Sequence, residues 1–210
     1  MKEDYIKKLD ESAERREFKF SPQIEVREEG ENRVIRGIAA VVNKTTDLGY
    51  FQERIQPGAF DDRLGDDIVV LFNHDPNLPL ARTTANGDAK ASVYITESGD
   101  LGYEFIAPRT QLGNDLLENI RSGVISKSSF AFTVEDDYWE FASDSNDLEM
   151  DRRTIRKVKR LYDVSPVTYP AYNQTDVGVA QRSLERALMP EKEAAKDAVE
   201  RDNDLRNLDL

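Results

Sequence analysis

Short apolar runs separated by polar turns fill the chain from about residue 18 to residue 182, a pattern typical of β-strands. Two pairs of runs flank polar, glycine-containing turns and therefore predict β-hairpins: Ile24–Val26 with Val34–Ile38, and Ala91–Ile95 with Leu101–Ile106. Other apolar runs predict further strands: Gly37–Val42, Asp67–Phe72, Ser129–Val134 and Val158–Val164. The pattern as a whole predicts an α+β fold that is mainly β.

Helical spacing is confined to a few segments. Residues 114–123 predict the clearest helix, because Asn114 can cap its start and Gly123 can end it. The hydrophobic residues that share one face of this helix are Leu116, Leu117 and Ile120. A single helical turn is predicted at Pro57–Leu64.

The same patterns divide the chain into zones. Residues 1–17 are expected to be a charged N-terminal tail or a short helix, and residues 18–182 the folded domain. Residues 183–210 predict a charged helical tail, broken at Pro190. Within the domain, the polar residues 135–153 predict an insertion inside a hairpin.

The amino-acid composition excludes several kinds of metal site and catalytic mechanism. The 210 residues suit one domain with tails, and 39% of them are hydrophobic, which is enough for one core. The absence of cysteine excludes disulfides, iron–sulfur clusters, thiolate zinc sites and a cysteine nucleophile. The single histidine, His74, excludes two-histidine metal motifs and any mechanism that needs two imidazoles.

The charge balance is acidic. A formal net charge of −12 and an isoelectric point of about 4.7 disfavour a general nucleic-acid binder, which needs a cationic face. The charged N-terminus lacks the apolar run of a signal peptide. No stretch reaches the roughly 20 apolar residues that span a bilayer. We therefore expect neither nucleic acid nor a membrane among the partners.

His74 follows the end of the predicted strand Asp67–Phe72, in a polar cluster. Histidine is the usual general base at neutral pH, so this position is a candidate for catalysis. The alternative is a surface histidine that Asn73 or Asp75 stabilises.

Ser129 begins a predicted strand with two different faces. Alternation places Ser129 with Ala131 and Thr133 on one face, and Phe130 with Phe132 on the other, which must be the core face. A rigid strand is a suitable place for a nucleophile. The alternative is a serine in a solvent-facing turn.

Asp163 lies inside an apolar strand, on the same face as Leu161 and Ser165. A buried acid needs a partner. The alternatives are an exposed aspartate or an ion pair with an arginine from Arg152–Lys159. Together with His74 and Ser129 it would supply a nucleophile, a base and an orienting carboxylate. The chain has no GxSxG motif, which disfavours the α/β-hydrolase form of such a triad.

Five segments, in this order and spacing, resemble the prohead proteases of tailed bacteriophages, which are relatives of the herpesvirus assemblins. They are Arg36–Asn43, Phe51–Phe60, Leu71–Pro76, Gly123–Phe132 and Asp163–Tyr172. The resemblance covers most of residues 18–182. It implies a serine endopeptidase on a compact assemblin-like β-barrel with a few flanking helices, and it implies no metal or organic cofactor.

The resemblance also implies a role and partners. Such enzymes act in the host cytoplasm, inside the assembling procapsid. There they cleave scaffold or the extension of the major capsid protein, and then themselves. Homo-oligomerisation stays open. The alternative function is a catalytically silent scaffolding or assembly protein on the same barrel.

The resemblance carries over to individual residues. The catalytic histidine of the family falls on His74, and its serine falls on Ser129. The herpesvirus branch uses a second histidine as third member, which this chain lacks. Asp163 stands where the phage pattern commonly has an acid.

Two further candidates are kept as alternatives. Ser128 is the competing nucleophile, although alternation turns it to the opposite face of the strand. Glu104 is the second candidate for the carboxylate. Backbone N–H groups are expected to serve as oxyanion donors.

Overall fold

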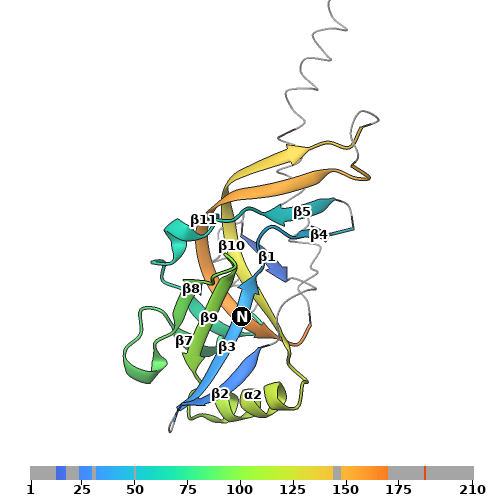
Figure 1. Ribbon diagram of the computed structural model, residues 1–210. Helices are drawn as coiled ribbons and strands as arrows, with labels where there is room; N and C mark the ends of the chain where they lie inside the picture. Colours follow the sequence, from blue (N-terminus) through green and yellow to red (C-terminus); the bar gives the residue numbers. More distant parts are fainter. Residues whose placement is uncertain are drawn as a thin grey trace, which may run out of the picture.

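The computed structural model describes residues 13–17, 24–29, 32–49, 51–143, 148–169 and 187, and within these ranges the chain is mainly β (Figure 1). The strands are β1 (Glu14–Glu17), β2 (Glu25–Glu29), β3 (Asn32–Ala40), β4 (Thr45–Asp47), β5 (Gln52–Ile55), β6 (Val69–Phe72), β7 (Asp75–Arg82), β8 (Ser92–Ile95), β9 (Leu101–Ile106), β10 (Lys127–Glu140) and β11 (Arg152–Val167). The helices are α2 (Gln111–Arg121) and two short 3₁₀ turns, η1 (Asp61–Arg63) and η2 (Gly87–Ala89).

The strands form a larger and a smaller sheet. The larger follows the order β1-β10-β11-β5-β4, and β6 also pairs with β11 and with β7. The smaller follows the order β2-β3-β9-β8 and is antiparallel throughout. The two hairpins predicted from the sequence are confirmed as β2–β3 and β8–β9. The mainly β class is confirmed, but both sheets are open, and no closed barrel is found among the described strands.

The long hairpin of β10 and β11 runs through the molecule (Figure 1). Its β11 strand pairs in parallel with β5 near one end and with β6 near the other. The prediction of a polar insertion over residues 135–153 is therefore wrong in part, because β10 continues to Glu140 and β11 begins at Arg152. Cross-strand contacts explain the longer strands: Arg153 donates to Asp137 at 2.6 Å, and Trp139 packs edge-on against Phe51.

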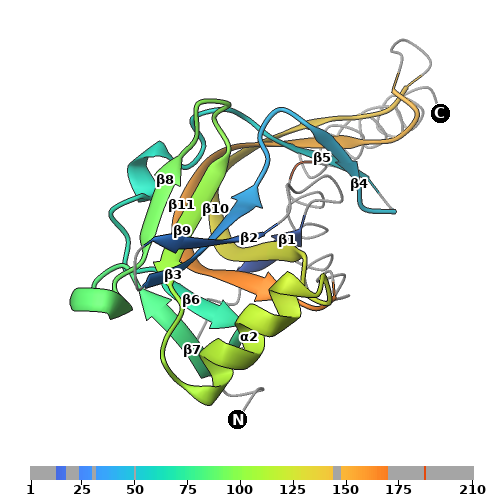
Figure 2. The ribbon, with the colours of Figure 1, turned by 60° about the horizontal axis from the view of Figure 1, so that its bottom comes forward.

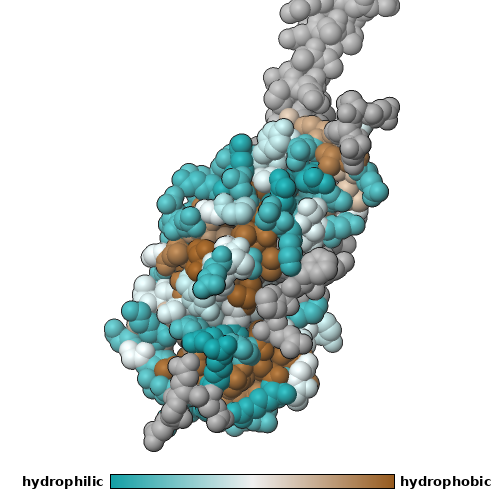
Figure 3. Space-filling model, in the orientation of Figure 1, coloured by the Kyte–Doolittle hydropathy of each residue, from teal (hydrophilic) through white to brown (hydrophobic). Residues whose placement is uncertain are grey.

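The hydrophobic core contains residues from both sheets and α2. Phe130 and Phe132 of β10 are fully buried and stack with a centroid distance of 4.7 Å. Tyr103 and Phe105 of β9 belong to the same core cluster. On the face of the molecule shown in Figure 3, hydrophobic residues appear in patches separated by hydrophilic ones.

Helix α2 lies beside β2 and β7 (Figure 2) and buries the predicted apolar face of Leu116, Leu117 and Ile120. It starts earlier than predicted, because the hydroxyl of Thr110 accepts from the backbone N–H of Gly113 at 3.2 Å and caps it. Asn114 instead accepts a hydrogen bond from Arg33 at 2.8 Å. Gly123 follows the helix with φ of +76°, as predicted for its end.

The N-terminal zone departs from expectation. Residues 14–17 form strand β1 rather than a helix or tail, and they pair antiparallel with Ser129–Phe132 of β10. Residues 1–12 lie outside the described residues. The predicted tail over 183–210 also lies outside them, except for Ala187, which is helical and packs against the cluster of Phe51 and Trp139.

Candidate active site

The turn between β6 and β7 presents His74. Phe72 pairs with Asp75 across this hairpin, and Asn73 and His74 lie between them. Both have positive φ angles, 55° and 54°, as a two-residue hairpin turn of type I′ requires. This left-handed conformation costs a residue other than glycine about 1–2 kcal/mol. Surrounding contacts must therefore hold the turn in place.

Asn73 connects the turn to the end of β11 through two hydrogen bonds. Its backbone N–H donates to the carbonyl of Pro166 at 3.0 Å. Its side-chain oxygen accepts from the backbone N–H of Thr168 at 2.8 Å. The sequence suggested Asn73 only as a neighbour of a surface histidine, whereas in the structure it positions a buried one.

The three candidate side chains meet around the imidazole of His74. Its Nε2 lies 2.6 Å from Oγ of Ser129, and its Nδ1 lies 2.5 Å from Oδ1 of Asp163. Both are hydrogen-bond distances. The exposed fraction is 6% for His74 and 0% for Ser129 and Asp163. The ring therefore contacts a hydroxyl through one nitrogen and a carboxylate through the other, away from solvent.

Strand pairing sets the position of Asp163. It pairs with Val69 on the parallel strand β6, so it lies beside the strand that leads to His74. Ser165 donates to its Oδ1 at 2.8 Å and lies 3.3 Å from Nδ1 of His74. Within the described part of the chain, Oδ2 of Asp163 has no hydrogen-bond partner. The carboxylate is thus neither exposed nor paired with an arginine, and Ser165 is a contact that the sequence analysis missed.

The alternation predicted for β10 places Ser128 and Ser129 on different faces. Phe130 and Phe132 belong to the core cluster. Ser128 points to the same side, because its Oγ lies 2.9 Å from the hydroxyl of Tyr103. Burial raises the pKa of Tyr103, so this hydroxyl stays protonated. Ser128 is therefore a core residue, hydrogen-bonded away from His74.

The hydroxyl of Ser129 has a second contact, with the main chain of β1. Its Oγ lies 3.0 Å from the carbonyl oxygen of Arg16, which is a hydrogen-bond distance. In the antiparallel register, Arg16 pairs with Phe130 and Glu17 pairs with Ser129. An N-terminal strand therefore runs directly past the candidate nucleophile.

Glu104, the second candidate carboxylate, lies away from this cluster. It is on β9 of the smaller sheet and accepts from Arg36 at 2.7 Å, with a third of its side chain exposed. The structure therefore brings Asp163 to His74 and leaves Glu104 on the surface.

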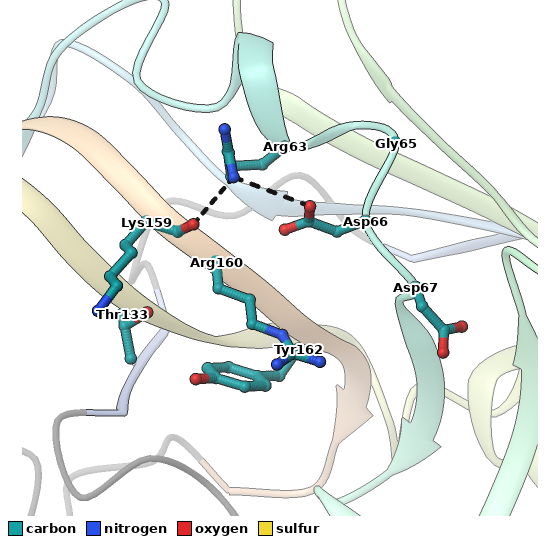
Figure 4. A pocket seen from close by; sticks show the side chains of 8 residues that line it. All are labelled: Arg63, Gly65, Asp66, Asp67, Thr133, Lys159, Arg160 and Tyr162. Carbon is teal, nitrogen blue, oxygen red and sulfur yellow. Dashed lines mark hydrogen bonds and ion pairs between the residues drawn. The ribbon is translucent and has the colours of Figure 1, made fainter.

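A pocket of about 490 Å³ lies elsewhere on β10 and β11 (Figure 4). Its lining residues are Arg63, Gly65, Asp66, Asp67, Thr133, Lys159, Arg160 and Tyr162. In Figure 4, Arg63 reaches the carbonyl of Lys159 at 3.0 Å and the carboxylate of Asp66. None of His74, Ser129 and Asp163 lines this pocket, so the candidate site and the pocket are separate.

The family model of caudovirus prohead serine proteases matches residues 22–190, well over half of the chain. The chain belongs to this family. The solved capsid assembly protease gp21 of bacteriophage T4 is similar with a TM-score of 0.48 and 13% identity, over 76% of this chain and 98% of that one. No curated protein matches the chain.

Membership of the prohead protease family confirms the resemblance found in the sequence. The family implies a capsid maturation protease that acts inside the procapsid. In the part of the chain that the structure describes, no helix is both long and apolar enough to cross a membrane. The matched range contains His74, Ser129 and Asp163, whereas β1 precedes it.

Proposed function

We propose that this prohead protease is a serine endopeptidase in which Ser129 is the nucleophile, His74 the general base and Asp163 the orienting carboxylate. The single observation that supports this most is the pair of contacts on His74, 2.6 Å to the hydroxyl and 2.5 Å to the carboxylate. A serine hydroxyl is a weak nucleophile until an adjacent base takes its proton. A carboxylate on Nδ1 holds the tautomer whose Nε2 is free to accept that proton.

The first half of the reaction forms an acyl-enzyme. Oγ of Ser129 attacks the carbonyl carbon of the scissile bond while its proton passes to Nε2 of His74. The resulting imidazolium is stabilised by the ionised carboxylate of Asp163, which itself stays unprotonated. The C–N bond then breaks, and His74 gives the proton to the departing amine.

The second half restores the enzyme. A water molecule attacks the ester carbon and passes one proton to Nε2 of His74. The C–O bond to Ser129 breaks, the new carboxylic acid leaves, and the proton returns to Oγ. The negative charge on the carbonyl oxygen in both halves is expected to be met by backbone N–H groups.

The substrates we propose are the scaffold or the N-terminal extension of the major capsid protein, and the enzyme itself, in the procapsid. Membership of the prohead protease family supports this choice of substrates. The competing function is a scaffolding protein without activity. The geometry around His74 disfavours it, because a silent protein has no need to keep a base between a serine and an aspartate.

Co-expression with the capsid protein tests the proposal. Ser129→Ala should abolish processing, seen on a gel as the persistence of the full-length capsid protein. Ser128→Ala is the matched control, since it removes the neighbouring hydroxyl and leaves the contacts of His74 intact. A fluorophosphonate probe should label Ser129 in the native chain and in Ser128→Ala. Normal processing by Ser129→Ala, or absence of both processing and labelling in the native chain, would contradict the proposal.

A further inference from the structure

Strand β1 places a main-chain carbonyl beside the proposed nucleophile. The carbonyl oxygen of Arg16 is 3.0 Å from Oγ of Ser129. In a serine protease, the carbonyl group of the bond to be cleaved has to lie in contact with this hydroxyl. The carbonyl group of Arg16 is therefore already in contact with the hydroxyl of Ser129, through its oxygen, in the region where the carbonyl group of a substrate has to lie.

Strand β1 also has the form of an added strand. It is the edge strand of the larger sheet and pairs antiparallel with β10 from Glu14 to Glu17. It lies outside the range that matches the family, which begins at residue 22. Pairing with an exposed strand edge is a common way for proteins to bind an extended peptide. The position of β1 is thus that of a bound segment, although it belongs to the same chain.

The side chains of β1 alternate, and those of Glu14 and Arg16 are buried, with exposed fractions of 1% and 6%. Arg16 donates to both carboxylate oxygens of Glu53, at 2.5 and 3.0 Å. Glu14 accepts two hydrogen bonds from Arg153, at 2.7 and 2.9 Å. Arg15, between them, is only partly buried.

The partners of β1 form a charged pair of their own. Arg153 donates to Glu53 at 3.0 Å, and both residues lie inside the family-matched range. We infer that β1 occupies the groove that binds the part of the substrate on the N-terminal side of the scissile bond. Glu53 and Arg153 then recognise the side chains of the substrate in this groove. Glu53 selects an arginine immediately before the scissile bond, and Arg153 selects an acidic residue two positions earlier. This inference rests on the proposed function of Ser129.

The selection has a physical basis. Both recognition contacts are two-point hydrogen bonds between a guanidinium group and a carboxylate, which fix geometry as well as charge. A substrate with a neutral residue at either position would leave one of these buried charges incompletely paired. Arg15 makes no such contact with the residues that the structure describes, so the middle position should tolerate many residues.

A labelling experiment on the full chain tests whether β1 occupies the groove. The double variant Glu14→Ala/Arg16→Ala removes one acid and one base, and so leaves the net charge of the cluster unchanged. It should react with a fluorophosphonate probe at Ser129 at least about tenfold faster than the native chain, because the groove is free more of the time. Arg15→Ala is the matched control and should react at the native rate. An unchanged rate in a double variant that still unfolds cooperatively on heating would overturn the inference.

A peptide series on the native chain tests the selection without any change to the fold. A peptide with the sequence of residues 11–20 should be cleaved after the arginine equivalent to Arg16. Glutamine in place of that arginine, or in place of the glutamate equivalent to Glu14, should lower kcat/KM about 100-fold. Glutamine at the Arg15 position should lower it by less than about threefold. Equal cleavage of all four peptides would overturn the inference.

Variants of the enzyme complete the test. Glu53→Gln should lose most of the preference for arginine over glutamine, while Glu104→Gln, a substitution on the other sheet, should keep it. The two proposals fail differently. Absence of probe labelling and of any peptide cleavage would remove the proposed function, whereas labelling and cleavage without dependence on the arginine and the acid would remove only the inference on β1.

Discussion

Two groups of polar side chains are buried beside β10, and they differ in how completely their hydrogen-bonding groups are paired. In the ionic group of Glu14, Arg16, Glu53 and Arg153, every side chain makes at least two hydrogen bonds to the others. In the group around His74, one oxygen of Asp163 has no partner within the described residues. Burial is common to both groups, so burial alone does not distinguish the proposed catalytic group from the ionic one.

The comparison separates two uses of buried charge. Two acids and two bases that neutralise each other fix the position of a strand, since removing any one leaves an uncompensated charge. A histidine between a hydroxyl and a carboxylate instead keeps a proton that can move. Substitutions should therefore change activity in one group and stability, or substrate choice, in the other.

Removal of the base should have the largest effect. His74→Ala should reduce kcat for peptide hydrolysis by about 10⁶-fold, because no other group can take the proton of Ser129. Urea unfolding of the same variant should remain cooperative. Substantial residual hydrolysis would mean that another base serves Ser129, and would break the comparison.

Substitution of the carboxylate of Asp163 should reduce kcat less than removal of His74. Asp163→Asn keeps the shape but favours the wrong tautomer of His74, and a loss of about 10⁴-fold in kcat is expected. Asp75→Asn, which changes the carboxylate that directly follows His74 in the chain, is the control and should retain native kcat. Equal activity of Asp163→Asn and the native chain would show that His74 and Ser129 act without this carboxylate.

Substitutions in the ionic group should lower the stability of the fold. Arg153→Ala leaves Glu14 and Glu53 partly unpaired and should lower the free energy of unfolding by about 3–5 kcal/mol. Arg156→Ala removes an exposed arginine three positions along the same strand, paired with Asp136 at 2.8 Å, and should cost about 0–1 kcal/mol. Denaturant titration of both variants measures the difference. Similar losses would mean that burial adds nothing to the ionic group.

Ser165 offers a finer probe of the group around His74. Ser165→Ala removes the hydrogen bond to Asp163 and should lower kcat about tenfold, the effect of one hydrogen bond to a charged group. KM should stay unchanged, because Ser165 acts through Asp163 and not on the substrate. A change in KM alone would place Ser165 in substrate binding instead.

The smallest effect concerns pH. Burial would raise the pKa of Glu53, but Arg16 and Arg153 outweigh it and lower that pKa below its usual value. The stabilisation by ionised Glu53 is therefore complete above the ordinary glutamate pKa of about 4.3, and is lost as the pH falls through the lowered value. The difference in unfolding free energy between the native chain and Glu53→Gln should stay constant from about pH 7 to pH 5, and shrink only in stronger acid. A difference that already vanishes near pH 5 would contradict the lowered pKa.

Local patterns in the sequence were enough to predict many of the strands and the face on which Ser129 lies, whereas the roles of His74, Ser129 and Asp163 were expected from the resemblance to the prohead proteases. The alternation around Phe130 and Phe132 correctly separated Ser129 from Ser128, since a strand with one apolar face leaves only one register. The apolar run before His74 correctly predicted a strand that ends near it. Both signals depend on neighbours within a few residues.

Pairings between distant residues could not be predicted in the same way. The charges of Glu14 and Arg16 suggested a solvated tail, because their partners Glu53 and Arg153 lie far along the chain. The left-handed turn at Asn73 contains no glycine, which is the usual sequence signal of such a turn. The parallel approach of β11 to β6, which brings Asp163 to the histidine, likewise leaves no trace in local periodicity.

The hairpin of β10 and β11 has a consequence for how this chain can evolve. Ser129 pairs with Ser165, and Ala131 pairs with Asp163, so two members of the site share one ladder. Because side chains alternate, deleting a single residue between these pairs would turn Ser129 or Asp163 to the opposite face. Gains and losses of residues in related sequences should therefore accumulate around 141–151, beyond the last cross-strand pair, and avoid the segment that holds the site.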